Sequence, residues 1–249
     1  DEIEKGEILR ITGYAEDENG TKLANFPIGF GMWDKEHLSP AFEIGSGTTD
    51  ELGNFDFNAT DFLSAIPGIN ELYAASYKQG FLGYDGPKDV EISSDTVLTV
   101  SAPESVGKGQ SLIVSGMLLD IGGIPAVNEE IEFEIREGNG FGGRCNPSGW
   151  RPYRCDIGST TTDSFGNFVF NWTVPEEGEP EADDDYSLET HFAGSTYLND
   201  NTVTTDLIIM DETVGLEANI SVEQEYFGND FYINGSVLEK AVENGEIRI

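Results

Sequence analysis

The sequence predicts an all-β protein built from tandem β-sandwich domains. Three observations lead to this prediction: apolar and polar residues alternate over short segments, turn residues separate these segments, and one pattern occurs twice along the chain. Alternation with a period of two is typical of half-buried strands. No segment sustains the 3.6-residue apolar period of a helix together with capping residues, so we expect helix to be scarce.

A repeated 17-residue pattern sets the domain organisation. Residues 44–60 (IGSGTTDELGNFDFNAT) match residues 157–173 (IGSTTTDSFGNFVFNWT) at 12 of 17 positions without a gap. A strand segment precedes each copy, around Gly13 in the first and Gly116 in the second, and a third such segment surrounds Gly235. The chain therefore contains three related units.

The repeat spacing places the domains at residues 1–94, 95–211 and 212–249. The first is expected to lack its opening strand, because only DEIEKGE precedes its anchor strand. The third is expected to be the N-terminal part of a sandwich that further sequence, or a strand from another chain, would complete. We expect short linkers near residues 93–95 and 210–213, with little freedom between the domains.

The TTDxxGNFxF segment of each repeat predicts a turn followed by a core strand. The aspartates, Asp50 and Asp163, are expected to accept hydrogen bonds from backbone N–H groups ahead of them. The phenylalanines that follow should point into the core, which leaves Asn58 and Asn171 on the outer faces. A short helix at residues 61–66 is the best helical candidate in the chain.

The charge of the chain excludes several partners. Asp and Glu number 47 against 13 Lys and Arg, which gives a net charge of -34. Such a surface repels nucleic acid and anionic lipid headgroups. Three explanations for the excess of negative charge remain open: a high-salt habitat, calcium bound to part of the carboxylate surface, or a well-solvated outer wall. No apolar run approaches the roughly 20 residues that a membrane helix needs, so we expect no direct membrane insertion.

The second unit carries an inserted loop with both cysteines of the chain. The distance from the anchor glycine to the repeat aspartate is 37 residues in the first copy and 47 in the second, and Cys145 and Cys155 are ten residues apart. A disulfide that closes the insertion is the preferred interpretation, and reduced surface thiols are the alternative. Aromatic and arginine side chains on the loop are candidates for contact with a protein or glycan ligand: Trp150, Arg151, Tyr153 and Arg154.

The anchor pattern also resembles a known group of repeats. The turn DENG followed by LANFPIGF and TTDELGNFDF is similar to the prealbumin-like and bacterial-type Ig-like repeats of archaeal and bacterial cell-surface proteins, and VPEEGEPEADDDYSLETHFAGSTYLND resembles their closing hairpin. The resemblance implies immunoglobulin-like (Greek-key) sandwiches, an extracellular location at the cell surface, and a mechanical or spacer role. It identifies no ligand.

Further candidate sites follow from local motifs. Five asparagines begin glycosylation sequons: Asn19, Asn58, Asn171, Asn219 and Asn234. A run of carboxylates before the closing hairpin is a calcium candidate, with Glu179, Glu181, Asp183, Asp184 and Asp185 as ligands, although a solvated charge run is the simpler interpretation.

Two lysines stand at the same place in successive repeats. Lys5 and Lys108 each lie eight residues before an anchor glycine, Gly13 and Gly116. We expect them to be exposed. The resemblance to cell-surface repeats implies an alternative, in which each lysine forms an isopeptide bond with an Asn or Asp side chain.

No catalytic machinery is recognisable. The two histidines, His37 and His191, lie in different predicted domains, without a nucleophile motif or metal-ligand spacing around them.

The preferred function is a structural repeat segment of a large extracellular cell-surface protein, in a surface layer, stalk or filament. Its partners would be neighbouring domains or identical subunits. The alternative is an adhesin module that binds carbohydrate or protein through the cysteine loop, and a third possibility is an accessory part of a large extracellular hydrolase. No cofactor is expected, apart from the calcium alternative.

Overall fold

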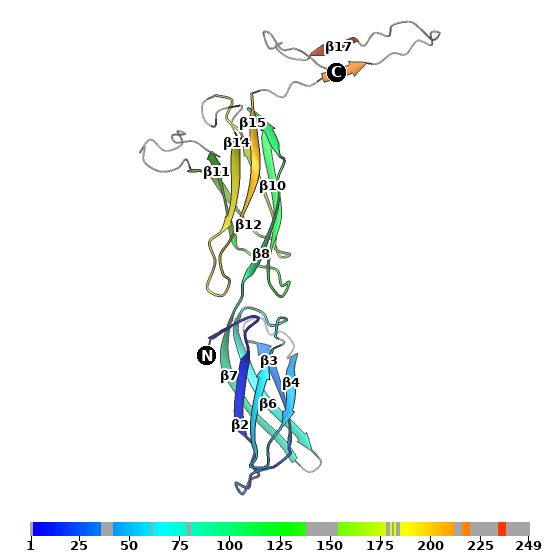
Figure 1. The fold of residues 1–249 in the computed structure, drawn as a ribbon, viewed down its shortest axis with the longest axis vertical. Coiled ribbons are helices and arrows are strands. Elements are labelled where there is room, and N and C mark those ends of the chain that lie inside the picture. The colour runs from blue at the N-terminus through cyan, green and yellow to red at the C-terminus, as the bar shows by residue number, and fades with distance from the viewer. Residues whose placement is uncertain are drawn as a thin grey trace, which may run out of the picture.

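The computed structural model describes most of the chain, and every element that it describes is a strand. The predicted all-β class is confirmed: two immunoglobulin-like β-sandwiches follow one another end to end (Figure 1). The described residues are 2–35, 42–60, 62–78, 81–137, 154–177, 180, 182, 185–211, 216–219 and 234–237.

The first sandwich consists of a five-stranded sheet and a two-stranded sheet. The larger sheet has the order β1-β7-β6-β3-β4, and the smaller sheet pairs β2 with β5. Neighbouring strands are antiparallel, apart from β1 and β7, which are parallel. In chain order the strands are β1 (Glu2–Glu4), β2 (Leu9–Tyr14), β3 (Pro27–Asp34), β4 (Phe42–Thr48), β5 (Asn54–Ala59), β6 (Gly68–Lys78) and β7 (Phe81–Ser93).

The second sandwich repeats this topology with one additional strand. Its larger sheet has the order β12-β11-β14-β15-β9, and its smaller sheet has the order β13-β10-β8. In chain order the strands are β8 (Thr96–Ser101), β9 (Ser105–Gly107), β10 (Ser111–Asp120), β11 (Glu130–Glu137), β12 (Arg154–Thr161), β13 (Asn167–Thr173), β14 (Asp185–Phe192) and β15 (Asn201–Met210). The remaining described strands form an antiparallel hairpin of β16 (Leu216–Asn219) and β17 (Asn234–Val237).

The start of the first sandwich contains a short strand that the sequence pattern did not predict. The short strand β1 pairs parallel with β7, in the same position that β9 has against β15. A counterpart of β8 is not found among the residues described before β2. Three residues are too few for an alternating pattern to reveal a strand, and for this reason β1 was missed.

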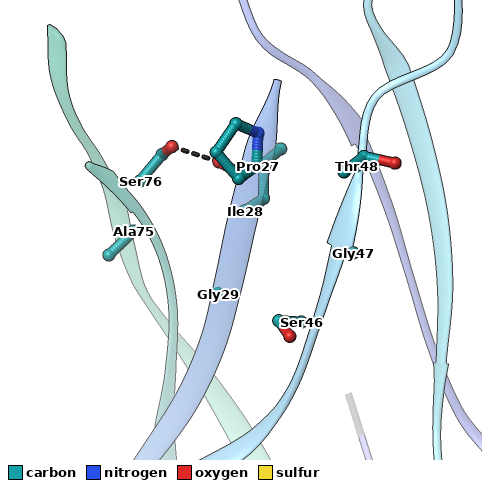
Figure 2. A pocket seen from close by; sticks show the side chains of 8 residues that line it. All are labelled: Pro27, Ile28, Gly29, Ser46, Gly47, Thr48, Ala75 and Ser76. Atoms are coloured by element: carbon teal, nitrogen blue, oxygen red, sulfur yellow. Dashed lines mark hydrogen bonds between the residues drawn. The ribbon is translucent and has the colours of Figure 1, made fainter. Parts of the chain in front are cut away.

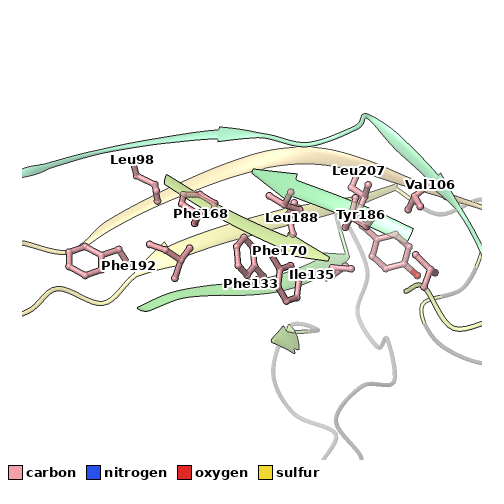
Figure 3. Close-up of a cluster of buried hydrophobic side chains, with 14 of the residues drawn as sticks. Leu98, Val106, Phe133, Ile135, Phe168, Phe170, Tyr186, Leu188, Phe192 and Leu207 are labelled. Carbon is pink, nitrogen blue, oxygen red and sulfur yellow. The ribbon is translucent and has the colours of Figure 1, made fainter. Parts of the chain in front are cut away.

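The two copies of the repeat build the same aromatic core. In the first sandwich Phe57 stacks on Phe30, with ring centres 4.8 Å apart. In the second, Phe170 stacks on Phe133, with ring centres 4.2 Å apart. Figure 3 shows this second pair within the cluster of buried side chains between the two sheets. The predicted inward direction of the phenylalanines is confirmed.

The anchor glycines allow a second phenylalanine of each repeat to pack against the neighbouring strand. A Cβ atom on Gly13 would lie 2.5 Å from the ring of Phe55, and one on Gly116 would lie 2.4 Å from the ring of Phe168. Any larger residue would displace the ring from the core. This close approach explains why a glycine stands opposite the aromatic strand in both copies.

The predicted helix at residues 61–66 is wrong for the described residues 62–66. They form a turn in which the N–H of Ala65 donates to the carbonyl of Phe62 at 2.9 Å. Phe62 and Ala65 are buried at the end of the first sandwich, with exposed fractions of 1% and 0%. Pro67 and β6 follow at once, so the segment is too short to offset the cost of helix nucleation.

The repeat aspartates form the predicted turns. Asp50 accepts hydrogen bonds through Oδ1 from the N–H groups two and four residues later, both at 2.8 Å. Asp163 does the same at 2.8 and 2.9 Å. These backbone donors hold the pKa of both carboxyls below the usual value.

Candidate functional site

The joint between the two sandwiches contains a buried ion pair. Lys5 follows β1, and its backbone N–H donates to the carbonyl of Ser93 at 2.9 Å, which sends the side chain toward the second sandwich. Its Nζ donates to the carboxylate of Asp120 and, at 2.9 Å, to the carbonyl of Leu63. The side chains of Lys5 and Asp120 are 0% and 1% exposed. The expectation that Lys5 is solvent-exposed is therefore wrong.

Asp120 uses its two oxygens for two purposes. It ends β10, and Oδ1 accepts the N–H of Ile124 at 2.8 Å, which closes the turn that follows. The other oxygen, Oδ2, pairs with Lys5. The turn of the second sandwich and its contact with the first sandwich thus share one carboxylate.

The same turn touches the first sandwich through its backbone. A Cβ atom on Gly122 would lie 2.0 Å from the carbonyl oxygen of Leu63 and 2.9 Å from Nζ of Lys5. Only glycine leaves room for this contact. The two sandwiches meet without space for an intervening side chain at this point.

The linker itself is held by backbone hydrogen bonds. β7 ends at Ser93 and β8 begins at Thr96, so two residues connect the sandwiches. Ser94 is fully buried, its N–H donates to the carbonyl of Tyr197, and its carbonyl accepts the N–H of Asn199, both at 2.9 Å. A loop of the second sandwich is therefore hydrogen-bonded to both backbone polar groups of this linker residue.

Asn199 also joins two carboxylates at the rim of the joint. Its side-chain amide donates to Oε1 of Glu4 at 2.9 Å and to Oδ1 of Asp95 at 2.8 Å. The negative charge of Asp95 raises the pKa of Glu4. Inside the joint, burial lowers the pKa of Lys5, while the hydrogen bond and charge of Asp120 act in the opposite direction.

Sequence reasoning missed the ion pair at the joint, although a signal was present. Lysine recurs eight residues before the anchor glycine, as Lys5 and Lys108, and an acidic residue recurs four residues after it, as Asp17, Asp120 and Glu239. Both patterns occur in the first two domains, and nothing local indicates that the lysine of one domain meets the acid of the next.

The sequons differ in their setting. Asn19, Asn58 and Asn171 are exposed, and the last two lie on β5 and β13 beside the inward phenylalanines. Asn219 and Asn234 are opposite one another in the β16–β17 pair. Glycosylation of these residues stays a prediction.

The loop and calcium hypotheses concern residues that the structure describes only in part. Arg154 and Asp185 begin β12 and β14, and Cys155 is half-buried in β12 against the core. Among the described residues, no group of three or more His, Cys, Asp or Glu side chains could hold a metal ion. The disulfide, the ligand contacts and the calcium site stay predictions. The residues outside the described part are Cys145, Trp150, Arg151, Tyr153, Glu179, Glu181, Asp183 and Asp184.

The outer face of the first sandwich has a shallow trough of about 380 Å³. Figure 2 shows its lining along β3, β4 and β6, where Ser76 donates a hydrogen bond to the carbonyl of Pro27. The side chains are small and carry no charge: Pro27, Ile28, Gly29, Ser46, Gly47, Thr48, Ala75 and Ser76. The trough offers space but no reactive group. In the described part of the chain, no helix has the length and apolar character for a membrane span.

Comparisons with known proteins add a likeness of fold only. No protein-family model matches the chain, and no curated protein sequence matches it. The native conformation of the Escherichia coli alpha-2-macroglobulin is similar at 14% identity and a TM-score of 0.35, over 90% of this chain and 15% of that one. A marsupial T cell receptor is similar at 10% identity and a TM-score of 0.34, over 90% of this chain and 76% of that one. This chain thus spans a small part of the macroglobulin, and neither likeness carries an argument about function.

Proposed function

We propose that this chain is a structural repeat segment of a large extracellular cell-surface protein, in which tandem sandwiches form a stiff rod within a surface layer, stalk or filament. The buried Lys5–Asp120 ion pair across the joint is the observation that carries the proposal. A spacer must hold successive domains at a constant angle. A buried, hydrogen-bonded charge pair does this because it tolerates few alternative geometries.

The length of the linker supports the same function. A flexible tether between independent modules needs exposed polar residues, whereas here two residues connect the strands and Ser94 is buried between the sandwiches. Bending at the joint would break backbone hydrogen bonds and separate Lys5 from Asp120 in one movement. The cost of this separation makes the two sandwiches move as one body.

The surface location is supported by properties of the whole chain. A net charge of -34 keeps a densely packed coat solvated and repels nucleic acid. Exposed sequon residues on both sandwiches fit a glycosylated outer surface. The partners in this proposal are neighbouring domains of the same protein or identical subunits, and no catalytic step is involved.

Backbone ¹⁵N relaxation of the full chain tests the stiff joint. We expect both sandwiches to report one common rotational diffusion tensor, and we expect separate tensors after Lys5→Met. Lys22→Met is the matched control, because Lys22 forms an ion pair with Glu16 on the surface, with side chains 42% and 41% exposed. Independent tumbling of the two sandwiches in the unchanged protein would rule out a rigid spacer.

Electron microscopy of the native material tests the assembly. A lattice, a filament or a stalk built from the protein supports the proposed role. Isolated particles that never associate, with the protein in the cell interior, would contradict it.

A further inference from the structure

The outer face of the first sandwich carries a second hollow, and this one is aromatic. It has a volume of about 250 Å³ and is lined by Trp33, Glu71, Tyr73, Tyr84 and Pro87 from strands β3, β6 and β7. Trp33 is 38% exposed and Tyr84 is 66% exposed. Its volume lies just below the roughly 300–1,000 Å³ of sites for drug-sized ligands, so it suits one small ring.

The two tyrosines are arranged as one surface. A Cβ atom on Gly31 would lie 2.3 Å from the ring of Tyr73, so the absence of a side chain at Gly31 lets the ring lie across β3. Tyr73 and Tyr84 have ring centres 6.2 Å apart and an angle of 29° between their planes. The exposed ring of Tyr84 and the half-buried ring of Tyr73 together offer an aromatic surface to the solvent.

The tryptophan is held in place at the edge of this surface. Its Nε1 donates to Oε2 of Glu71 at 2.6 Å. Lys35 lies 3.4 Å from the same carboxylate and 3.0 Å from Asp89. Glu71 therefore gives the hollow an ordered, charged hydrogen-bonding group, and Lys35 and Asp89 lie beside it in the same ion-pair network. The chain as a whole is strongly acidic.

The second sandwich shows that the fold does not require these aromatic residues. β3 pairs Phe30 with Ala74 and β11 pairs Phe133 with Thr190, so the two sheets can be aligned residue by residue. In this alignment Arg136 stands in place of Trp33, Glu134 in place of Gly31 and Glu189 in place of Tyr73. Arg136 pairs there with Glu189 at 2.8 Å.

The difference between the two copies lies on the surface and not in the core. The repeat keeps the stacked phenylalanines in both sandwiches, whereas the same outer positions are aromatic in one and charged in the other. A sheet of this topology is stable with an ion pair at these positions. The aromatic set in the first sandwich therefore calls for an explanation beyond folding.

We propose that this hollow binds a neutral saccharide, with one sugar ring stacked on Tyr73, Tyr84 and Trp33. A pyranose ring has apolar C–H faces and a rim of hydroxyl groups, which match an aromatic floor with charged hydrogen-bonding groups around it. The hydroxyls would bond to Glu71, Lys35 and Asp89. The negative charge of the chain disfavours an anionic ligand. A quaternary ammonium ion is also disfavoured, because the carboxylate of Glu71 is already paired with Lys35.

The neighbouring trough gives the saccharide room to extend. Along β3 and β6 the register places Gly29 opposite Ala75, Gly31 opposite Tyr73 and Trp33 opposite Glu71. The trough and the aromatic hollow are thus consecutive on one face of the sheet. A second sugar ring can lie over the small side chains shown in Figure 2.

NMR titration of the full chain tests this site, because the indole N–H of Trp33 gives a resolved signal that Trp33→Phe identifies. The probes are cellobiose, maltose and N,N′-diacetylchitobiose, with choline and inorganic phosphate as competing chemistries. We expect at least one disaccharide to shift the Trp33 signal at concentrations up to about 10 mM, where millimolar binding is measurable. Tyr84→Ala should weaken that binding about tenfold, equivalent to about 1.4 kcal/mol.

Phe165→Ala is the matched control, because Phe165 is an aromatic residue that is 69% exposed on a turn of the second sandwich. It should leave the binding unchanged, and both variants should keep the amide spectrum of the folded protein. The proposal is overturned if no disaccharide shifts the Trp33 signal, if Tyr84→Ala and Phe165→Ala bind alike, or if only choline or phosphate binds.

Discussion

The ring of Phe170 lies parallel to the ring of Phe133, at an angle of 6° and with ring centres 4.2 Å apart. Phe133 comes from the larger sheet and Phe170 from the smaller one, so the stacked pair joins the two layers of the second sandwich. Phe57 and Phe30 join the layers of the first sandwich in the same way, at an angle of 15°. The strongest repeat in the sequence is therefore the part that holds the layers together.

Removal of one ring of this pair should destabilise the second sandwich strongly. Phe170→Ala is expected to cost about 3–5 kcal/mol, because it deletes a buried aromatic side chain and leaves a cavity between the sheets. Urea unfolding followed by far-ultraviolet circular dichroism measures the change. Phe165→Ala, on an exposed turn, should change stability by less than about 0.5 kcal/mol. Equal effects of the two substitutions would show that the stack contributes little.

Gly158 should not tolerate a side chain. It has a φ of 131°, and a Cβ atom there would lie 3.1 Å from the ring of Phe170. We expect Gly158→Ala to lose about 1–3 kcal/mol through backbone strain, in addition to displacement of the ring. Thermal unfolding compares it with Gly83→Ala, a strand glycine with open space around its Cβ position. A Gly158→Ala variant as stable as Gly83→Ala would contradict this account of the repeat.

The ion pair at the joint should couple the unfolding of the two sandwiches. Lys5→Met leaves the Asp120 carboxylate buried without its cation, which costs about 3–5 kcal/mol while the joint stays closed. Separation of the sandwiches returns that carboxylate to water. We therefore expect calorimetry to show one transition in the unchanged protein and two in Lys5→Met.

A double variant separates charge from packing at the joint. Lys5→Met with Asp120→Asn removes both charges and keeps an acceptor for the N–H of Ile124, so part of the coupling should return. If the unfolding of the two sandwiches is less coupled in the double variant than in Lys5→Met alone, the ion pair does not control the joint.

The repeat aspartate should give a defined dependence of stability on pH. Backbone N–H groups, first that of Phe165, hold the pKa of Asp163 below its usual value. Its carboxylate therefore stabilises the folded state above the unfolded pKa of about 3.9, and this contribution is lost as the pH falls through the lower folded pKa.

Asp163→Asn isolates this contribution from the general repulsion among the acidic residues. Urea unfolding at a series of pH values should show a constant stability difference between the two proteins above about pH 5 and a smaller difference below about pH 3. A difference that does not change over this range would show that the charge of Asp163 is irrelevant to the turn.

Much of the fold could be predicted from the sequence because its signals are local. Alternation around Phe55 and Phe57 indicates a strand with its apolar side inward, and Asp50 followed by Gly53 indicates the turn before it. Repetition of the pattern at Asp163 and Phe168 then reveals a second domain. These features depend on residues within about one strand of each other, and for this reason the structure reproduces them.

The ion pair at the joint could not be predicted in this way. Lys5 and Asp120 are 115 residues apart, and their contact depends on how one finished sandwich docks on the next. From the sequence alone, the best estimate for a lysine beside a short strand is an exposed side chain, since burial of a single charge is costly. Only the partner from the other domain makes the burial possible.

The aromatic hollow could not be predicted from the sequence for the same physical reason. Trp33, Tyr73 and Tyr84 come from strands β3, β6 and β7, and β4 and β5 lie between the first two of these along the chain, so the sheet brings together residues that are far apart in the sequence. The sequence by itself determined the strands, the turns and the stacked cores, because hydrophobic alternation and turn chemistry act over a few neighbouring residues. Only the tertiary structure decided the ion pair at the joint and the outer-face hollow, because strand pairing and domain docking select which distant side chains meet.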